Sequence, residues 1–356
     1  MGRPLIGHAA LGVRGRVRTL AGTGVRGHAG DGGPAVRAAV AEPYGVAIGP
    51  DGALYVCEVA AHSIRRIDLR TGRIETAAGC GDRGYSGDGG PAREARLNEP
   101  YEVRFDRAGN MYFVEMKNHV VRRVGLDGRI ETVAGCGEAG FSGDGGAARK
   151  AKLNRPHSIA IVGESLFICD IGNHRVRRVD LATGRIETFA GTGRRGPTPD
   201  GAPLDGTPLN GPRALDVGRG GDLWLALREG NAVYRIDMGA RRLFHVAGTG
   251  ERGYRGAGGP AKHALLSGPK GIAVGPGGDV FLADTESHTI RVIRARTGVI
   301  ETIVGDGVRG DGPDGDPRRC RLARPHGVCV DRRGRVFIGD SENHKVRVWE
   351  PAPVTP

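Results

Sequence analysis

A segment of about 56 residues recurs six times along the chain, and this repetition limits the possible folds more than any other feature. Two clear copies are "LNEPYEVRFDRAGNMYFVEMKNHVVRRVG", from Leu97, and "LNRPHSIAIVGESLFICDIGNHRVRRVD", from Leu153. The prolines that open the copies are Pro43, Pro100, Pro156, Pro212, Pro269 and Pro325, spaced by 57, 56, 56, 57 and 56 residues. Fixed-period self-similarity indicates a repeat architecture. We therefore expect function to reside in positions that differ between copies.

Each copy is predicted to form four short strands. In the first copy these are "YGVAI", "LYVCE", "HSIRRID" and "RIETAAG", with the turns "GPDG" and "LRTG" within the two hairpins. Gly and Asp suit tight hairpin turns. The apolar first strand is typical of a strand buried on both faces, and polarity rises toward the fourth strand. Arginine pairs such as Arg65-Arg66 are expected to point outward. The pattern predicts an all-β fold, a six-bladed β-propeller of four-stranded blades.

The two ends of the chain predict how the ring closes. "GRVRTLAGTG", from Gly15, matches the fourth strand "GRIETAAGCG" of the first full copy, from Gly72, whereas the last copy stops after its third strand. The N-terminal strand is thus expected to complete the last blade, which removes an exposed sheet edge. We expect an N-terminal extension over 1–14, a single propeller over 15–350 and a C-terminal tail over 351–356.

A glycine-rich insertion makes each copy longer than the roughly 40–45 residues of a WD-type blade. It is clearest in "GDRGYSGDGGPAREARL", from Gly81 to Leu97. "PAREARL" predicts a single helical turn with proline at its start. The six insertions are expected to rise as a wall around the mouth of the channel, and Asp31, Asp88 and Asp144 to hold their own turns.

Composition narrows the function classes. The formal charge is +12 with 11 His counted as neutral, but arginine is spread evenly over the repeats and aromatic residues make up only 5%. Both observations disfavour nucleic-acid binding. The six cysteines form no CxxC pair, which favours reduced thiols. No signal peptide or membrane-length apolar run is evident. We expect a cytoplasmic monomer with no membrane association.

The dipeptides Asn118-His119, Asn173-His174 and Asn343-His344 precede the third strand of their copies. With the Pro-x-[Gly/Ser]-[Val/Ile] start of the first strand, they make the chain resemble the NHL-repeat propeller family. That family includes enzymes, RNA-binding proteins and protein-interaction modules, so the resemblance implies the fold and leaves function open. Because the His recurs in five copies, we expect a turn and packing role for it.

Two sets of equivalent positions, one from each copy, are predicted to lie at the rim of the central channel. The first set follows each opening proline: Tyr44, Tyr101, His157, Arg213, Lys270 and His326. The second set ends each second strand: Glu58, Glu115, Asp170, Leu227, Asp284 and Asp340. The first set varies among large, chemically active residues, which favours a site over a structural role.

The first set offers acid–base groups beside cations. His157 and His326 are candidate general acids or bases. Tyr44 and Tyr101 could donate a proton or an oxyanion hydrogen bond, and Arg213 and Lys270 could bind a substrate carboxylate or phosphate. The alternative is that the carboxylates of the second set only pair with Arg213, Lys270 and ordered water.

The acidic residues of the second set are candidate ligands of one divalent cation. Carboxylates suit Ca²⁺ or Mg²⁺, and the tentative ligands are Glu58, Glu115, Asp170, Asp284 and Asp340. "PHS" at His157 and "PHG" at His326 are similar to peptidyl-hydroxyglycine amidating lyase, which implies a zinc held by three histidines. The third His is absent, so Zn²⁺ is disfavoured. Lactonase-like propellers, also similar, use a carboxylate-held cation.

The favoured hypothesis is a cytoplasmic enzyme acting on a small polar or anionic metabolite in the channel. Its chemistry would be that of a lyase, isomerase or cyclase, with a hydrolase less favoured. The alternative is a non-catalytic module that binds protein or RNA.

Overall fold

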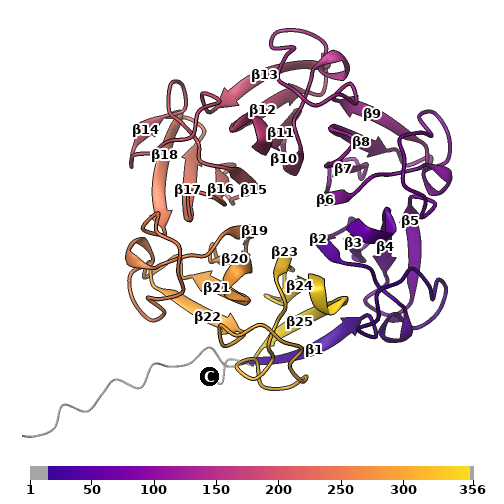
Figure 1. Ribbon diagram of the computed structural model, residues 1–356, viewed down its shortest axis with the longest axis vertical. Coiled ribbons are helices and arrows are strands. Elements are labelled where there is room, and N and C mark those ends of the chain that lie inside the picture. The colour runs from indigo at the N-terminus through magenta and orange to yellow at the C-terminus, as the bar shows by residue number, and fades with distance from the viewer. Residues whose placement is uncertain (1–14, 353–356) are drawn as a thin grey trace, which may run out of the picture.

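The computed structural model describes residues 15–352. Six antiparallel sheets surround a central axis, as Figure 1 shows. Five sheets have four strands, and the fourth blade carries one additional short strand, β14 (Ala202–Pro203), at its outer edge. The predicted all-β, six-bladed propeller is therefore confirmed. The proposed extension over 1–14 and positions 353–356 of the tail lie outside the described residues.

The strands of each blade follow one another outward from the axis. The inner strands are β2 (Pro43–Ile48), β6 (Pro100–Phe105), β10 (Pro156–Val162), β15 (Pro212–Val217), β19 (Pro269–Val274) and β23 (Pro325–Val330). The second strands are β3 (Leu54–Glu58), β7 (Met111–Glu115), β11 (Ser165–Asp170), β16 (Leu223–Leu227), β20 (Val280–Asp284) and β24 (Val336–Asp340). The third strands are β4 (Ser63–Ile67), β8 (Val120–Val124), β12 (Arg175–Asp180), β17 (Ala232–Asp237), β21 (Thr289–Ile293) and β25 (Lys345–Pro351). The outer strands are β5 (Ile74–Ala78), β9 (Ile130–Ala134), β13 (Arg185–Ala190), β18 (Arg242–Ala247), β22 (Ile300–Val304) and β1 (Gly15–Ala21).

The ring closes as the sequence predicted. Strand β1 pairs antiparallel with β25, from Gly15 opposite Pro351 to Ala21 opposite Val346. The sixth blade thus has the order β1-β25-β24-β23 and combines both ends of the described chain. We call the end of the ring at which the inner strands begin, marked by the six opening prolines, the proline face.

The glycine-rich insertions run along the periphery of the ring (Figure 1). In every blade a glycine N–H of the insertion bonds a carbonyl of the outer strand: Gly32–Ile74, Gly89–Ile130, Gly145–Ile186, Gly201–Leu243, Gly258–Ile300 and Gly315–Val17. These bonds cover the edge of the outer strand, which would otherwise be open to pairing. The predicted wall around the channel mouth is therefore wrong, because backbone pairing draws the insertions outward.

The predicted helical turn within the insertion is present as a 3-10 turn. It forms η1 (Ala35–Arg37), η3 (Ala92–Glu94), η4 (Ala148–Lys150) and η6 (Ala261–His263). The alanine that begins each turn is buried, so the turn fastens the insertion to the blade beneath it. Within residues 15–352, no helix is long and apolar enough to cross a membrane.

A second set of 3-10 turns follows the second strands: η2 (Val59–Ala61), η5 (Ile171–Asn173), η7 (Thr285–Ser287) and η8 (Ser341–Asn343). The residue before each third strand is left-handed, with φ between 43° and 57°, at His62, His119, His174, Asn231, His288 and His344. His119 Nδ1 accepts the Arg155 N–H of the next blade at 3.0 Å, and His288 Nδ1 accepts that of Arg324 at 3.1 Å. In the fourth blade Asn231 Oδ1 accepts the Gly268 N–H at 2.9 Å. His62 and His344 make the same bond, whereas Nδ1 of His174 has no partner among residues 15–352. In four of its five blades the recurrent His is thus a latch to the next blade, which confirms its predicted turn and packing role.

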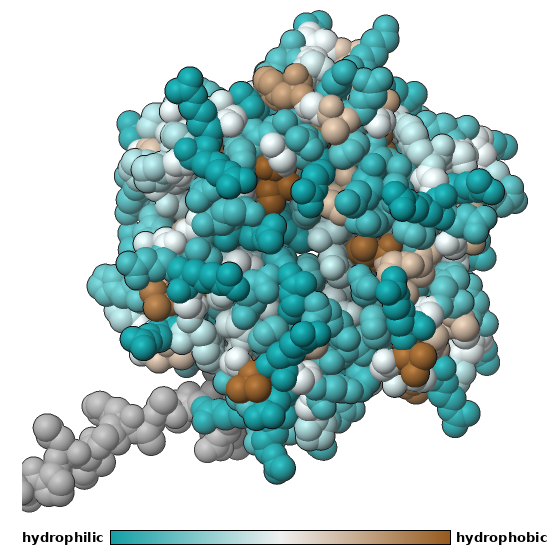
Figure 2. Space-filling model, viewed as in Figure 1, coloured by the Kyte–Doolittle hydropathy of each residue, from teal (hydrophilic) through white to brown (hydrophobic). Residues whose placement is uncertain are grey.

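Glycines allow the inner strands to approach one another closely around the axis. A Cβ atom at Gly271 would collide with the carbonyl oxygen of His326, and one at Gly327 with that of Tyr44. The face drawn in Figure 2 is mainly hydrophilic, with apolar side chains in separate small patches. The close approach of the inner strands brings the side chains of the first set together.

Candidate active site at the propeller axis

The six residues that follow the opening prolines meet at the axis, and we call them the axial cluster: Tyr44, Tyr101, His157, Arg213, Lys270 and His326. The ring of Tyr44 stacks on that of His326, with centroids 3.8 Å apart and planes 9° from parallel. Tyr101 lies edge-on to Tyr44 at 4.7 Å and packs against His157 at 4.5 Å. The two histidines are therefore joined through the two tyrosines. The sequence analysis predicted that these six residues lie together, but at the rim of an open channel. In the structure their side chains contact one another at the axis.

The cationic side chains complete the axial cluster. The guanidinium of Arg213 lies 4.7 Å from the centroid of the Tyr101 ring, and Lys270 Nζ lies 3.4 Å from His326 Nε2. The exposed fractions of His157, Arg213, Lys270 and His326 are only 4%, 3%, 5% and 4%, whereas the tyrosines are half-buried. Electrostatic interactions in such a site are stronger than in water.

Both histidines of the cluster are held in one tautomer. His157 Nδ1 lies 2.6 Å from the carbonyl oxygen of Arg155, and His326 Nδ1 lies 2.8 Å from that of Arg324. A carbonyl can only accept, so each Nδ1 carries the proton and each Nε2 keeps a free lone pair. Burial, assisted by neighbouring cations, holds both imidazole pKa values well below the ordinary range. The two rings are neutral bases at neutral pH.

Lys270 has the perturbed basicity expected of a proton-transfer group. Burial lowers the pKa of its ammonium to about 7, although Glu286 opposes the shift from 2.7 Å. Burial would raise the pKa of Glu286, but hydrogen bonds from Arg324 and Lys270 outweigh it and bring that pKa to about 2. Lys270 can therefore both give and take a proton near pH 7.

Arg213 is a buried cation without a counter-charge. Among residues 15–352 its guanidinium has no ion pair within 4.0 Å and no hydrogen bond. Burial lowers its pKa, and Arg228 adds to the shift. A desolvated, uncompensated cation favours the binding of an anion.

A second layer of charges lies further along the inner strands and was missed from the sequence. Arg104 binds Glu102 and also reaches the carbonyl oxygen of Leu215 in the fourth blade at 3.3 Å. Asp216 accepts the N–H of Val274 at 2.6 Å, and its charge adds to that of Glu102 in raising the pKa of Arg104. A comparison of the copies could have indicated this second layer. The fourth residue after the opening proline is alanine in three copies, but it is Arg104 and Asp216 in two others.

The second set of residues does not form the predicted metal site. Each carboxylate is fully buried and lies beside an arginine of its own blade: Glu58–Arg65 at 3.5 Å, Glu115–Arg122 at 2.8 Å, Asp170–Arg177 at 3.6 Å, Asp284–Arg291 at 3.6 Å and Asp340–Arg347 at 3.2 Å. Within residues 15–352, no group of three or more His, Cys, Asp or Glu residues is placed to hold a metal ion. The assignment of these five acids to a common cation is therefore wrong, because each serves its own blade.

The arginines of these pairs correct two further expectations. Arg65, Arg122 and Arg177 are fully buried, although they were expected to point outward. The insertion aspartates bind these guanidinium groups, at 2.5 Å for Asp31, 2.7 Å for Asp88 and 2.6 Å for Asp144. These aspartates fasten the insertion to the blade and do more than hold their own turns.

Comparison with known proteins agrees with this repeat geometry. The family model described as NHL repeat matches residues 266–293 and 322–349, the inner three strands of the last two blades. The last two blades are therefore NHL repeats, and the six-bladed propeller as a whole resembles that family.

NHL repeat-containing protein 2 of Bos taurus is 28% identical to this chain over 71% of its length, which corresponds to 38% of that relative. The chain thus spans about two fifths of the relative it matches. A gluconolactonase from Xanthomonas campestris has a TM-score of 0.59 at 14% identity, covering 99% of this chain and 96% of that one. A virginiamycin B lyase from Staphylococcus aureus has a TM-score of 0.53 at 19% identity, covering 88% and 81%. These structures share the fold.

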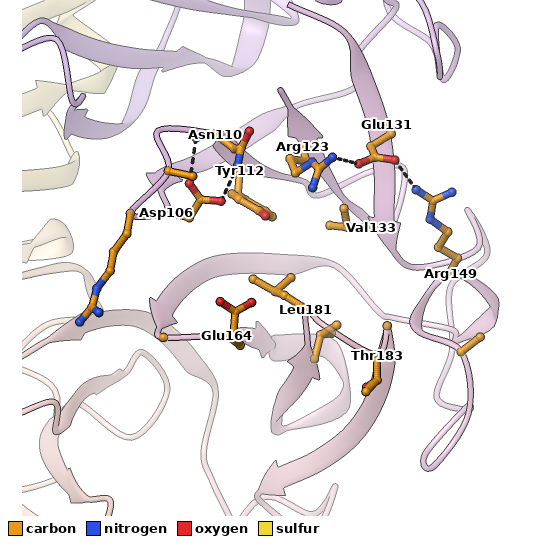
Figure 3. A pocket seen from close by; sticks show the side chains of 16 residues that line it. Asp106, Asn110, Tyr112, Arg123, Glu131, Val133, Arg149, Glu164, Leu181 and Thr183 are labelled. Atoms are coloured by element: carbon orange, nitrogen blue, oxygen red, sulfur yellow. Dashed lines mark hydrogen bonds and ion pairs between the residues drawn. The ribbon is translucent and has the colours of Figure 1, made fainter. Parts of the chain in front are cut away.

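The propeller also carries a groove between its second and third blades, away from the axis (Figure 3). This cavity of about 710 Å³ is lined by the turns after β6 and β10. Glu131 binds Arg149 at 2.6 Å and Arg123 at 2.5 Å, and Asp106 is held by Asn110 at 2.7 Å. Arg123, Glu131 and Arg149 satisfy one another at the exposed rim of the groove, whereas Arg213 of the axial cluster is a buried cation with no ion pair among residues 15–352. The axial cluster is therefore the stronger candidate for chemistry.

Proposed function

We propose that this chain is an enzyme acting on a small anionic metabolite at the axial cluster, by acid–base lyase, isomerase or cyclase chemistry. The observation that carries the proposal is the pair of buried cations, Arg213 and Lys270, beside two neutral imidazoles. Within the described part of the chain, only Glu286 forms an ion pair with either cation. A bound carboxylate or phosphate would supply the missing negative charge.

The geometry supports a division of roles. Arg213 orients the anionic group and Lys270 moves a proton, since its pKa of about 7 suits both directions. His326 Nε2 can take a proton from the substrate or exchange one with Lys270. Burial raises the pKa of both Tyr44 and Tyr101, so their hydroxyls stay protonated and can donate to a developing oxyanion.

The fold neighbours are compatible with this proposal, since they include proteins named as a gluconolactonase and a virginiamycin B lyase. The binding-module alternative has less support. Arg65, Arg122, Arg177, Arg291 and Arg347 are buried in ion pairs, so part of the basic character of the sequence is not offered to a nucleic acid. We further propose a cytoplasmic monomer. The three buried thiols of Cys57, Cys169 and Cys320 agree with a reducing compartment.

The test is turnover of a panel of small carboxylates, lactones and phosphate esters followed by proton NMR. Wild-type protein is compared with Lys270→Met and His326→Asn, and with His119→Asn as a matched histidine variant outside the axial cluster. We expect turnover that survives in His119→Asn and is lost in the two axial variants, with all four proteins folded by circular dichroism. Turnover that persists in both axial variants would place the chemistry elsewhere. No turnover, together with salt-dependent RNA binding, would support the binding module instead.

A further inference from the structure

The fourth blade replaces the internal ion pair of the other blades with uncharged residues. Leu227 stands where the others have an acid, and Tyr234 where they have the buried arginine. Gly230 takes the place of the asparagine found at Asn118, and Pro197 that of the aromatic residue found at Tyr85. Leu227, Gly230 and Pro197 each bring less side-chain volume, or one hydrogen-bonding group fewer, to the same region.

The second blade shows what normally occupies this region. The Arg122 guanidinium binds Glu115 at 2.8 Å, Asp88 at 2.7 Å and the carbonyl oxygen of Ser86 at 3.1 Å. It also lies 5.2 Å from the centroid of the Tyr85 ring. The third blade repeats the arrangement with its own arginine, aspartate and aromatic ring. The space is built around a guanidinium group.

The fourth blade keeps much of the frame that surrounds this group. Asp200 occupies the position of Asp88 and accepts the N–H of His245 at 2.9 Å, as Asp88 accepts that of Thr132. The carbonyl oxygen of Thr198 corresponds to that of Ser86 and accepts the Tyr234 hydroxyl at 2.5 Å. Both acceptors have thus remained, and Tyr234 and Lys262 now bond them in place of a single arginine.

A cavity of about 410 Å³ opens at this place, lined among others by Asp200, Asn210, Leu227, Glu229, Tyr234 and His245. Two of its lining residues, Asn210 and Glu229, each carry a buried acceptor atom, Oδ1 and Oε2, that has no hydrogen-bond partner among residues 15–352. Unsatisfied buried acceptors are costly and call for a donor. Arg228 binds only the other oxygen of Glu229, and Lys262 binds Asp200 from a half-exposed position.

We propose that this cavity, the blade-four pocket, binds an organic cation with a guanidinium or primary ammonium group. The cation takes the place of the arginine that the fourth blade lacks. Its N–H groups donate to Glu229, Asn210 and Asp200, and its planar face lies near the Tyr234 ring. The pocket is separate from the axial cluster, so the proposal does not depend on the proposed catalytic function.

The test is isothermal titration of the full chain with N-acetyl-arginine amide, with N-acetyl-citrulline amide as the neutral probe of the same shape. The matched variant is Leu227→Asp/Tyr234→Arg, which rebuilds the internal ion pair of the third blade and gives the pocket a guanidinium group of its own. We expect a dissociation constant at or below about 1 mM for the arginine probe, and at least about tenfold weaker binding by the citrulline probe and by the variant. Circular dichroism checks that the variant is folded. If it is not, Glu229→Gln provides the second test and is expected to weaken binding about tenfold.

Equal binding of the two probes, unchanged binding in the folded Leu227→Asp/Tyr234→Arg variant, or no binding to the wild type would overturn the proposal. Two further titrations distinguish the source of the cation. Tighter binding of a peptide with an internal arginine than of agmatine would indicate a side chain of a protein partner. The opposite order would indicate a free amine metabolite. Lys270→Met should leave all these affinities unchanged even if it abolishes turnover.

Discussion

Lys270 Nζ lies 3.4 Å from His326 Nε2 in a region from which water is largely excluded. The imidazole holds its only proton on Nδ1, so the ammonium donates to Nε2. The pair can therefore pass one proton back and forth without moving either backbone. This relationship links the burial of the two residues to their chemistry.

The ammonium of Lys270 should titrate with a pKa of about 7, because burial disfavours its charge. The measurement is the pH dependence of the lysine Hε/Cε signal in NMR, assigned by its loss in Lys270→Met. Glu286→Gln should lower the pKa further, because the carboxylate of Glu286 stabilises the ammonium. A pKa near the ordinary value of about 10.4 would contradict the prediction.

Replacing Arg213 with methionine should stabilise the protein in the absence of ligand by about 1–2 kcal/mol, since it removes a desolvated charge without emptying the space. The measurement is urea unfolding in a buffer without multivalent anions. Phosphate should stabilise the wild type and have no such effect on Arg213→Met. Arg228→Met, at a more exposed arginine paired with Glu229, is the control and should change stability little. Loss of stability in Arg213→Met would show that the cation is structurally compensated.

The histidine latches should make stability depend on pH. Burial lowers the pKa of His119, His288 and His344, whereas the unfolded chain keeps the ordinary value near 6.5. Native latches are neutral, so their full contribution is present above about pH 6.5 and is lost as the pH falls toward the lower folded pKa values. Urea unfolding at about pH 7.5 and about pH 5.5 measures this loss.

Replacing His119 gives the matched comparison for the latch. His119→Asn copies Asn231, which holds the same left-handed conformation and accepts the equivalent N–H. It should keep most of the stability and reduce the pH dependence. His119→Ala should cost about 1–2 kcal/mol through loss of the bond and the left-handed preference. Equal effects of the two substitutions would mean that the acceptor atom contributes nothing.

The buried ion pair of the second blade should tolerate joint replacement better than single replacement. Arg122→Met leaves Glu115 buried without its partner and should cost about 3–5 kcal/mol. Glu115→Leu/Arg122→Tyr, which copies Leu227 and Tyr234, should recover most of that loss. Arg123→Met, at a half-exposed neighbour, should cost less than about 1 kcal/mol. Additive losses in the double variant would contradict this prediction.

The repeat period sufficed to predict the blades, the closure by β1 and the grouping of the axial cluster. It could not predict the direction of the acidic side chains. Pro43 pairs directly with Glu58, but the strand register shifts between Pro43 and Val46. The simple alternation of side chains between the two faces of the sheet therefore does not relate Tyr44 to Glu58. Such an irregularity is set by local backbone packing and leaves no clear sequence mark.

The burial of Arg65 was also hidden in the sequence. Its strand reads Ile64-Arg65-Arg66-Ile67, and the alternation alone cannot say which arginine faces inward. The answer depends on Glu58 and Asp31, which come from elsewhere in the chain. Comparing the copies for joint changes, as at Leu227 and Tyr234, would have revealed the pair.

The pairing of β1 with β25 also determines how the ring would respond to mechanical force. Gly15 lies opposite Pro351, so the two ends of the described chain leave the sixth blade at the same end of one antiparallel ladder. A load pulling these ends apart would open the ladder one bond at a time, the geometry of a zipper, instead of shearing all its bonds together. The seam that closes the propeller is therefore also where the ring should yield first when stretched by its termini.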